Sequence, residues 1–159
     1  MPFARFYNRQ ELIAARARWR QEAKTVVFTN GCYDILHPGH IRLLEQAKSL
    51  GDFLILALNT DSSVRRLKGP GRPLVPEGER IAMAMALEAV DVVTIFDEDT
   101  PRELIAAVLP DILVKGADWA HFIAGREEVE ASGGKVQTIP LEAGQSTTGI
   151  VETILERSL

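Results

Sequence analysis

Two patterns of apolar residues alternate along the chain and predict its secondary structure. Short, continuously apolar segments are typical of strands that are buried on both faces, and apolar residues at a spacing of three or four are typical of helices. We expect strands at residues 25–29, 53–58, 91–96, 111–115 and 136–139. We expect helices over residues 9–23, from His37 to Gly51, over residues 79–89, after Thr100, between the last two strands and from Ser146 onwards.

The order of these elements predicts the fold. Buried strands that alternate with helices form parallel sheets whose two faces are both covered. No repeat, low-complexity tract or linker divides the sequence. We therefore expect one Rossmann-like α/β domain over residues 1–159, with a five-stranded, mainly parallel sheet covered by helices on both faces. A leading helix within residues 1–23, marked by the capping-box spacing of Asn8 and Glu11, would precede a core over residues 24–159.

One segment interrupts the alternation. Residues 64–78 contain three prolines, three glycines and four basic residues, a composition that predicts a loop. The basic residues would make a locally positive surface that suits a small anionic ligand. They are Arg65, Arg66, Lys68 and Arg72. The alternative is that they are no more than the charged surface of a solvated loop.

The composition restricts the class of protein. With 46% hydrophobic and 25% charged residues the chain is expected to be globular, and its longest apolar stretches are too short to span a membrane. A net charge of −4 argues against broad nucleic-acid binding. The N-terminus lacks the pattern of a secretion signal, and a single cysteine excludes an internal disulfide and fits a reducing compartment. We therefore expect a cytoplasmic protein.

Polar residues and glycines gather after the predicted strands. In open parallel sheets, ligands bind outside the carboxyl ends of the strands. The segments in this position are 30–40, 59–71, 96–101, 115–119 and 144–148, and we expect them to form one site. The sequence lacks the glycine-rich phosphate motifs of P-loop ATPases and of standard dinucleotide oxidoreductases, which argues against both classes.

The most distinctive of these segments ends in His37-Pro38-Gly39-His40. Pro38 suits the first position of a helix, so both histidines would stand beside the free N–H groups of a helix N-terminus, which attract phosphate. Gly39 would let a ligand approach the backbone closely. One alternative is that the histidines merely cap the helix or lie on the surface. A zinc site is another, but a closed four-ligand site is hard to assemble with one further histidine, His121, and one cysteine. We expect no metal site built by the protein.

The residues around the two histidines resemble a family signature. Together with the preceding Asn30–Asp34, they are similar to the HxGH motif of the cytidylyltransferase-like nucleotidyltransferases. The similarity continues in order over residues 24–157, at Lys68, Glu79-Arg80, Val114–Trp119 and Ser146–Thr148. Within that superfamily, five segments most resemble the adenylyltransferases that make ADP-heptose from heptose 1-phosphate. They are Leu67–Gly69, Arg72-Pro73, Leu87–Asp91, Glu98–Pro101 and Leu109–Gly116.

The resemblance implies roles for individual residues. His37, His40 and Lys68 would be catalytic: the histidines would contact the α- and β-phosphates of ATP, and Lys68 would clamp the phosphates from a flexible loop. The nucleotide would be bound by Asn30, Gly31, Cys32, Tyr33, Gly39, Lys115, Gly116, Ser146, Thr147 and Thr148. The acceptor would be bound by Asp34, Asp61, Arg72, Arg80 and Asp118. For the first two of these aspartates, the capping of a helix or turn is an equal alternative.

The implied reaction joins AMP from ATP to a sugar 1-phosphate and releases pyrophosphate. A phosphate monoester is largely dianionic at pH 7, so positioning and cationic stabilisation would suffice without a general base. Mg²⁺ would bridge phosphate oxygens of ATP and need few protein ligands. A separate sugar kinase would supply the acceptor, and the product would serve lipopolysaccharide or other surface-glycan synthesis. The resemblance also implies a homodimer. Neither nucleic acid nor a membrane is an expected partner.

Two other functions remain as alternatives. A cytidylyltransferase that acts on glycerol 3-phosphate or a similar small phosphate would share the phosphate-handling residues and differ in its base and acceptor pockets. A non-catalytic nucleotide-binding module could use the same fold, because fold alone does not fix function. The joint presence of both histidines, Lys68 and Ser146–Thr148 argues against the second alternative.

Overall fold

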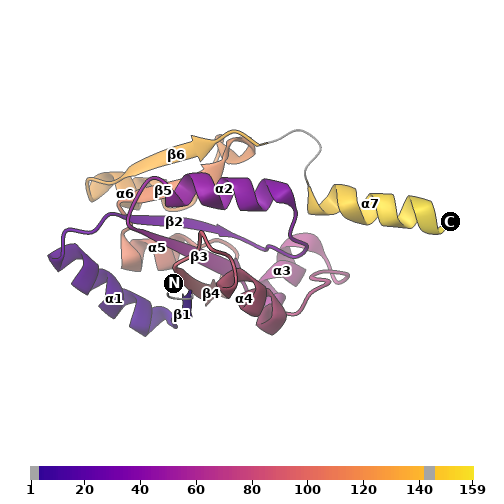
Figure 1. The fold of residues 1–159 in the computed structure, drawn as a ribbon, viewed down its shortest axis with the longest axis horizontal. Coiled ribbons are helices and arrows are strands. Elements are labelled where there is room, and N and C mark those ends of the chain that lie inside the picture. Colours follow the sequence, from indigo (N-terminus) through magenta and orange to yellow (C-terminus); the bar gives the residue numbers. More distant parts are fainter. Residues whose placement is uncertain (1–3, 142–145) are drawn as a thin grey trace.

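The computed structural model describes residues 4–141 and 146–159, and its centre is a six-stranded sheet (Figure 1). The strands are β1 (Arg5–Phe6), β2 (Val26–Gly31), β3 (Phe53–Asn59), β4 (Val92–Phe96), β5 (Ile112–Gly116) and β6 (Lys135–Ile139). They lie in the order β1-β4-β3-β2-β5-β6, and all neighbouring pairs are parallel. The predicted α/β fold is confirmed, with one correction: the sheet has six strands and not five.

The strand that the prediction missed is β1, at the edge of the sheet. Two backbone hydrogen bonds join it to the neighbouring strand β4 and the residue before it. Arg5 N donates to Asp91 O over 3.1 Å, and Tyr7 N donates to Val93 O over 3.0 Å. Two residues are too few to show either a continuous apolar run or an alternation. The strand therefore forms by pairing with β4, which the sequence pattern of its own residues does not reveal.

Seven helices and one short 3₁₀-helix connect the strands within the described residues. They are α1 (Arg9–Gln21), α2 (Pro38–Lys48), α3 (Asp61–Lys68), α4 (Glu77–Met85), α5 (Arg102–Val108), the 3₁₀-helix η1 (Ala117–Trp119), α6 (Arg126–Ala131) and α7 (Thr147–Ser158). The predicted capping box of α1 is present, because the side chains of Asn8 and Glu11 each accept the other residue's backbone N–H. Pro38 occupies the first turn of α2, as predicted.

Helix α3 corrects the prediction of a loop over residues 64–78. Thr60 caps the helix, since its hydroxyl oxygen accepts the N–H of Ser63 over 3.2 Å. The prolines and glycines of the segment all lie at or beyond Gly69, where α3 has ended. Their density over the whole segment obscured the helical residues before them. Lys68 is consequently the last residue of a helix and not a loop residue.

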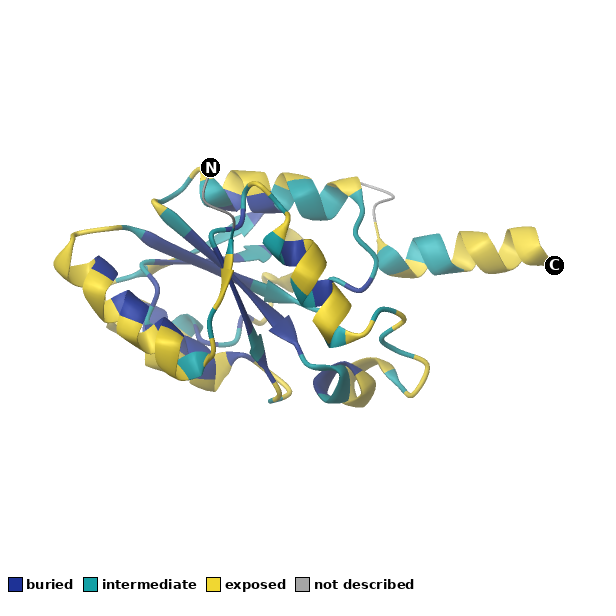
Figure 2. Ribbon diagram, turned by 60° about the horizontal axis from the view of Figure 1, so that its bottom comes forward, coloured by how far each residue is buried: buried dark blue, intermediate teal, exposed yellow. Residues whose placement is uncertain are grey.

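The helices cover both faces of the sheet (Figures 1 and 2). On one face, α1, α5 and α6 contribute Leu12, Leu104 and Val129 to a buried apolar cluster. On the other face, α2 and α4 contribute Leu44 and Ala84 to a second cluster. Helix α7 buries none of its residues and extends away from this body (Figure 1). Because both faces of the sheet are packed in this way, the sheet can support a binding site at the carboxyl ends of its strands.

The path of the chain through the sheet defines where a ligand can bind. From β2 the chain moves outward through β3 and β4, and it then returns to the opposite side of β2 as β5. This reversal opens a crevice outside the carboxyl ends of β2 and β5, the usual ligand position in open α/β sheets. No helix within the described part of the chain is long and apolar enough to cross a membrane.

Candidate active site

A cavity of about 470 Å³ lies at the carboxyl ends of the strands. It draws residues from the ends of β2, β3 and β5, from α3, from the segment after β4 and from the start of α7. Eleven of the predicted site residues line it: Asn30, Gly31, Cys32, Tyr33, Asp34, His40, Lys68, Lys115, Gly116, Asp118 and Thr147. Seven others do not line it: His37, Gly39, Asp61, Arg72, Arg80, Ser146 and Thr148. Residues 144 and 145 of the last predicted segment lie outside the described residues.

The two histidines cap helix α2 and also lie against each other. His37 is the N-cap, and its Nδ1 accepts the N–H of Gly39 over 3.1 Å. The Nδ1 of His40 accepts the N–H of His37 over 3.3 Å, which completes a capping box built from imidazoles. The ring centroids are 3.8 Å apart in a stacked arrangement. The alternative that the histidines cap the helix is therefore confirmed. The same hydrogen bonds hold the His40 ring at the cavity.

The hydrogen bonds of the cap fix the protonation of the two rings. An Nδ1 atom that accepts a hydrogen bond carries no hydrogen, so the hydrogen of each neutral ring is on Nε2. Burial, together with the nearby His37 and Lys68 charges, lowers the pKa of His40 to about 4. Burial also lowers the pKa of His37. At pH 7 the two imidazoles are therefore neutral donors through Nε2–H, and they contribute no cation to the cavity.

Tyr33 forms the next layer of this stack. Its ring centroid is 4.6 Å from that of His40, and its backbone has a left-handed φ of 48°. The ring lies so close to Gly31 that a Cβ at that position would be 2.8 Å from the Tyr33 Cε2 atom. Gly31 is therefore required for the tyrosine to fold back along the floor of the cavity. Burial raises the pKa of the Tyr33 hydroxyl, which stays protonated.

The positive charge in the cavity comes from two lysines on opposite sides of β2. Lys68 is at the end of α3, which follows β3, and Lys115 is on β5. Both ammonium groups act on the same thiol, because each lowers the pKa of Cys32 against the larger opposing effect of burial. No carboxylate of the described residues forms an ion pair with either lysine. Within the described part of the chain, the cavity thus holds two cations that form no ion pair.

Lys115 is the more buried of the two lysines. Its Nζ is 3.3 Å from the carbonyl oxygen of Asn30 and 5.3 Å from the ring centroid of Trp119. Burial lowers its pKa to about 8, although the nearby Asp118 and Cys32 favour the charged form. A desolvated ammonium without a paired carboxylate is costly, and an anionic ligand would repay that cost.

The rim of the cavity contains residues that the sequence analysis missed. They are Phe122 and Ala124 after η1 and Leu141 after β6; Leu67 of α3, which belongs to the predicted segment 59–71, lies beside them. With Trp119 they give the cavity an apolar wall, and Trp119, Phe122 and Leu141 remain about half exposed. Such a wall suits a planar base or the apolar face of a sugar. The only signal available for these residues was their position after a strand, because isolated apolar residues are not a motif.

Gly116 and Asp118 shape the cavity at the end of β5. A Cβ on Gly116 would lie 2.7 Å from Asp118 Oδ1 and 3.0 Å from a methyl group of Leu141. The missing side chain therefore lets the Asp118 carboxylate and Leu141 close over the backbone. Asp118 lines the cavity and is exposed, so its oxygens are available to hydroxyl groups of a ligand.

Arg80 lies beneath the cavity with its guanidinium fully engaged by the protein. Its side chain has no exposed area, and its N–H groups donate to four oxygens at 2.8–2.9 Å. The acceptors are the carbonyls of Val75, Cys32 and Asn59 and the carboxylate of Asp61. Arg80 thus ties the ends of β2 and β3 to the start of α3. The structure brings neither Arg80 nor Asp61 into the cavity.

Asp34 is similarly engaged, although it borders the cavity. Its carboxylate accepts the N–H groups of Leu74 and Val75 at 2.8–2.9 Å and pairs with Arg72 at 3.3 Å. The side chain of Asp34 is only 3% exposed, so no oxygen is left for an acceptor sugar. These bonds hold the segment after α3 against the loop that precedes α2.

The start of α7 joins the cavity through a single side chain. Ser146 caps the helix by accepting the N–H of Gly149 over 2.9 Å. Thr147 donates from its hydroxyl to the carbonyl of Ile35 over 3.1 Å and lines the cavity. Among the residues that the structure describes, no group of three or more His, Cys, Asp or Glu side chains is placed to hold a metal ion.

Fold and site together define a class: a doubly wound α/β protein with a lysine-bearing cavity at the switch point of its sheet. Comparison with known proteins gives the family. A model of the cytidylyltransferase-like family matches residues 28–153. This match covers most of the chain, and the chain belongs to this nucleotidyltransferase family.

Individual relatives narrow the comparison. The bifunctional protein HldE of Syntrophotalea carbinolica is 55% identical over 87% of this chain, and that of Trichlorobacter lovleyi is 52% identical over 94%. These matches cover 28% and 31% of the two relatives, so the chain spans less than a third of their length. The crystal structure of a lipopolysaccharide core biosynthesis protein from Thermoplasma volcanium is 30% identical, with a TM-score of 0.61, and covers 75% of this chain and 97% of that one.

Proposed function

We propose that this chain is an adenylyltransferase that transfers AMP from ATP to heptose 1-phosphate and yields ADP-heptose and pyrophosphate. The observation that carries the proposal is the convergence of His40, Lys68 and Lys115 on one cavity at the N-terminus of α2. The high identity to the HldE proteins and the five segments that resemble ADP-heptose synthases support the choice of substrates.

In the proposed reaction, an oxygen of the sugar phosphate attacks the α-phosphorus of ATP. The bond from the α-phosphorus to the bridging oxygen breaks, and pyrophosphate leaves with the electron pair. The attacking phosphate is already dianionic at pH 7, so no side chain has to accept a proton. The protein's task is to bring anions together and to stabilise the transferring group.

The site residues contribute to this task in different ways, according to whether each is neutral, positive or negative. The neutral His40 donates from Nε2–H to a phosphate oxygen, at the positive end of the α2 dipole. Lys68 and Lys115 supply the positive charge from opposite sides of β2. His37 supports His40 by stacking and capping. Asp118 and Trp119 offer a carboxylate for hydroxyl groups and an aromatic face for a ring.

Mg²⁺ is part of the proposal as the partner of ATP. The ion would enter on the triphosphate and keep most of its waters, so it would need few protein ligands. The ion would neutralise charge on the phosphate oxygens. A sugar kinase would supply the acceptor, and the free thiol of Cys32 supports a reducing, cytoplasmic location.

The decisive experiment is incubation with ATP, Mg²⁺ and a panel of α- and β-sugar 1-phosphates, analysed by mass spectrometry. We expect an ADP-heptose product and one equivalent of pyrophosphate. CTP and glycerol 3-phosphate form the matched alternative mixture. A product in that mixture alone would identify a cytidylyltransferase, and ATP binding without turnover on any acceptor would identify a non-catalytic module.

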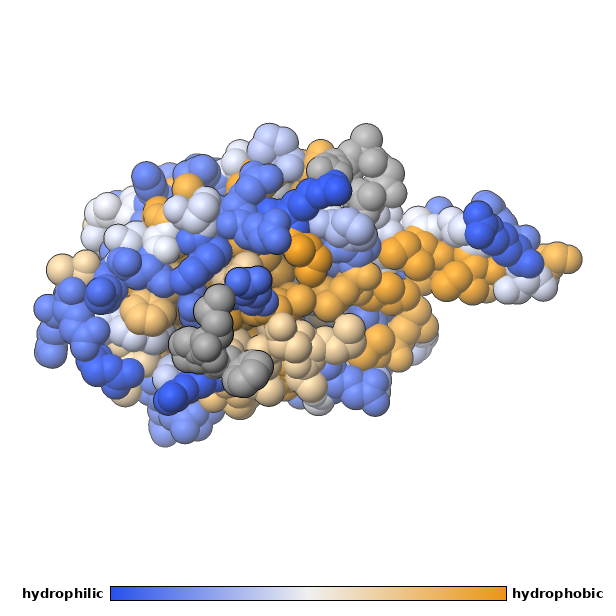
Figure 3. All heavy atoms as spheres, in the orientation of Figure 1, coloured by the Kyte–Doolittle hydropathy of each residue, from blue (hydrophilic) through white to orange (hydrophobic). Residues whose placement is uncertain are grey.

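We also propose a homodimer in which α7 packs on a second copy. Ile154 and Leu155 of α7 are more than half exposed, and apolar atoms run along one side of the helix (Figure 3). An isolated helix of this length is marginal in water, and a symmetric copy offers the same apolar face. Light scattering after size exclusion should give a dimer that Ile154→Glu converts to a monomer and Glu156→Gln does not. A monomeric parent protein would contradict this.

A further inference from the structure

The position of Lys68 depends on how α3 is held. Lys68 is exposed at the last residue of a helix of eight residues, and its ammonium group makes no hydrogen bond or ion pair among the described residues. Nothing on the lysine itself therefore fixes its place in the cavity. The placement has to come from contacts that the rest of α3 makes.

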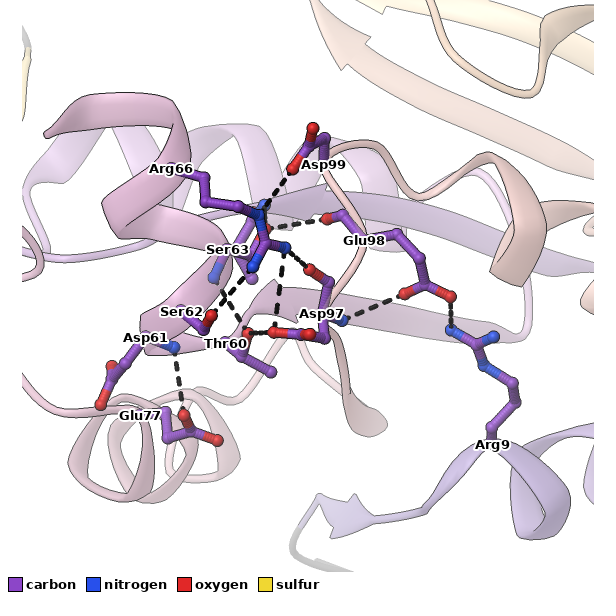
Figure 4. Close-up of polar contacts among 11 residues, drawn as sticks. Arg9, Thr60, Asp61, Ser62, Ser63, Arg66, Glu77, Asp97, Glu98 and Asp99 are labelled. Carbon is purple, nitrogen blue, oxygen red and sulfur yellow. Dashed lines mark hydrogen bonds and ion pairs between the residues drawn. The ribbon is translucent and has the colours of Figure 1, made fainter.

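Those contacts lead to the loop after β4 (Figure 4). The hydroxyl of Thr60, the cap of α3, donates to the carboxylate of Asp97, and the hydroxyl of Ser63 donates to the carbonyl of Glu98 over 2.8 Å. Arg66 follows three residues later on the same face of the helix. Residues 60, 63 and 66 thus form a row along α3 that faces residues 97–99.

Arg66 makes the largest number of these contacts. Its Nε donates to Asp99 Oδ1 over 2.9 Å, its Nη1 donates to Ser62 Oγ over 2.9 Å, and its Nη2 donates to the carbonyl of Asp97. A planar guanidinium holds several acceptors in fixed directions at once, which a lysine ammonium does not do. One side chain therefore joins the helix that carries Lys68 to the loop after β4.

The loop is itself anchored and forms part of the cavity. Glu98 pairs with Arg9 of α1 at 2.7 Å, so residues 97–99 are tied to the body of the protein (Figure 4). The next residues, Thr100 and Pro101, line the cavity together with Asp99. The loop is thus an anchored side of the cavity. Helix α3, which carries Lys68, is hydrogen-bonded to it.

We propose that Arg66 is a positioning residue that acts as a strut between α3 and residues 97–99 and thereby sets where Lys68 stands in the cavity. The inference rests on the proposed function, because it assigns Lys68 to the phosphates of the nucleotide. Arg66 itself does not line the cavity.

A double-mutant cycle tests the strut. Arg66→Ala should lower kcat/KM about tenfold or more, because a displacement near 1 Å in an active site carries a penalty of that order. In a Lys68→Ala background the same substitution should have little further effect, since both changes remove one interaction. If the two substitutions lowered kcat/KM independently, so that their factors multiplied in the double variant, the proposal would be overturned. Arg65→Ala is the control, because Arg65 is exposed on the same helix and, among the residues that the structure describes, its side chain forms no ion pair with the loop.

Two further variants separate geometry from charge. Arg66→Lys keeps the positive charge but not the planar fork, so it should recover only part of the lost rate. Arg66→Ala combined with Asp99→Asn removes both charges and should stay as slow as Arg66→Ala. Full recovery in either variant would mean that Arg66 acts by masking acidic charge, and the strut would be wrong. The melting temperature should change little throughout, because these ion pairs are exposed.

The cycle has a second readout that does not need turnover. Inorganic tripolyphosphate binding, measured by calorimetry, should weaken in Arg66→Ala, and the same substitution should weaken it little further in a Lys68→Ala background. If no sugar phosphate is turned over, the proposed function fails while this binding cycle still reports on the strut. If turnover is present and the binding cycle is additive, the strut fails alone.

Discussion

Two groups of polar side chains lie in and around the same cavity, and they differ in whether they form ion pairs within the protein. In the closed group, formed by Asp34, Arg72, Asp61 and Arg80, each charge is paired with an opposite charge. In the open group, formed by the neutral His40 and the cations Lys68 and Lys115, no ion pair forms among the described residues, although His40 Nδ1 and Lys115 Nζ each make one hydrogen bond. Motif resemblance selected both groups alike. The comparison teaches that a shared motif does not separate charges that the scaffold uses from groups that stay available to a ligand.

The two groups should respond to substitution in opposite ways. Removing a member of the closed group leaves buried oxygens and charges without partners, which destabilises the fold. Removing a member of the open group relieves an uncompensated charge or a spare donor, which spares the fold and weakens function. Stability and activity, measured side by side, therefore test the division.

The largest effect is expected from Arg80→Met in the closed group. The change leaves the Asp61 carboxylate and three carbonyls, that of Asn59 fully buried, without the Arg80 guanidinium, and removing a buried charged partner in this way costs about 3 kcal/mol. Urea unfolding should show this loss, and the exposed Arg65→Met should change the free energy of unfolding by less than about 0.5 kcal/mol. An Arg80→Met protein that is stable but does not bind ATP would move Arg80 into the open group.

The next effect is expected from His40→Gln in the open group. Glutamine at this position can still accept the His37 N–H, as in an ordinary capping box, but it removes the imidazole Nε2–H. We expect kcat to fall by about 10²–10³, the scale for losing one preorganised donor, with the stability retained. Pyrophosphate release measures the rate, and His121→Gln is the control because His121 does not line the cavity. Near-normal turnover would show that His40 serves the cap alone.

A smaller effect is expected from Lys115→Met. Removing one of two cations should weaken ATP binding about tenfold, the size of one charged hydrogen bond, and the free protein should be at least as stable as before. Calorimetry and thermal unfolding give the two values, with the exposed Lys135→Met as control. A loss of stability with unchanged affinity would assign Lys115 to the scaffold.

The smallest effect is a pH dependence with opposite signs. The pKa of Lys115 is about 8 in the folded protein, below the value of 10.5 for a free lysine, with Asp118 and Cys32 as its charged and titratable neighbours. ATP affinity should fall as the pH rises through 8, because the ammonium is lost. Stability should rise between pH 8 and 10.5, because the unfolded chain binds more protons there. Both trends should be reduced in Lys115→Met, and their persistence would exclude this lysine as the cause.

The sequence predicted the parts of the molecule that local pattern controls. The five longer strands and the position of the site at their carboxyl ends follow from apolar periodicity and the rule for open sheets. Arg80 and Lys115 could not be told apart in this way, because the acceptors of Arg80 lie up to 48 residues away in the chain. The strut of Arg66 was missed for the same reason, as its partners follow a different strand.

The imidazole cap of α2 has a consequence for acid tolerance. Each Nδ1 lone pair is occupied by a backbone N–H, so a proton added to that atom has to displace a bond that holds the first helical turn. Near pH 4, where His40 titrates, acidification would therefore loosen the first turn of α2 beside the cavity before it added a positive charge there. His37 caps the same turn through its own Nδ1, and burial lowers its pKa as well, so protonation of His37 would also compete with a bond of this turn.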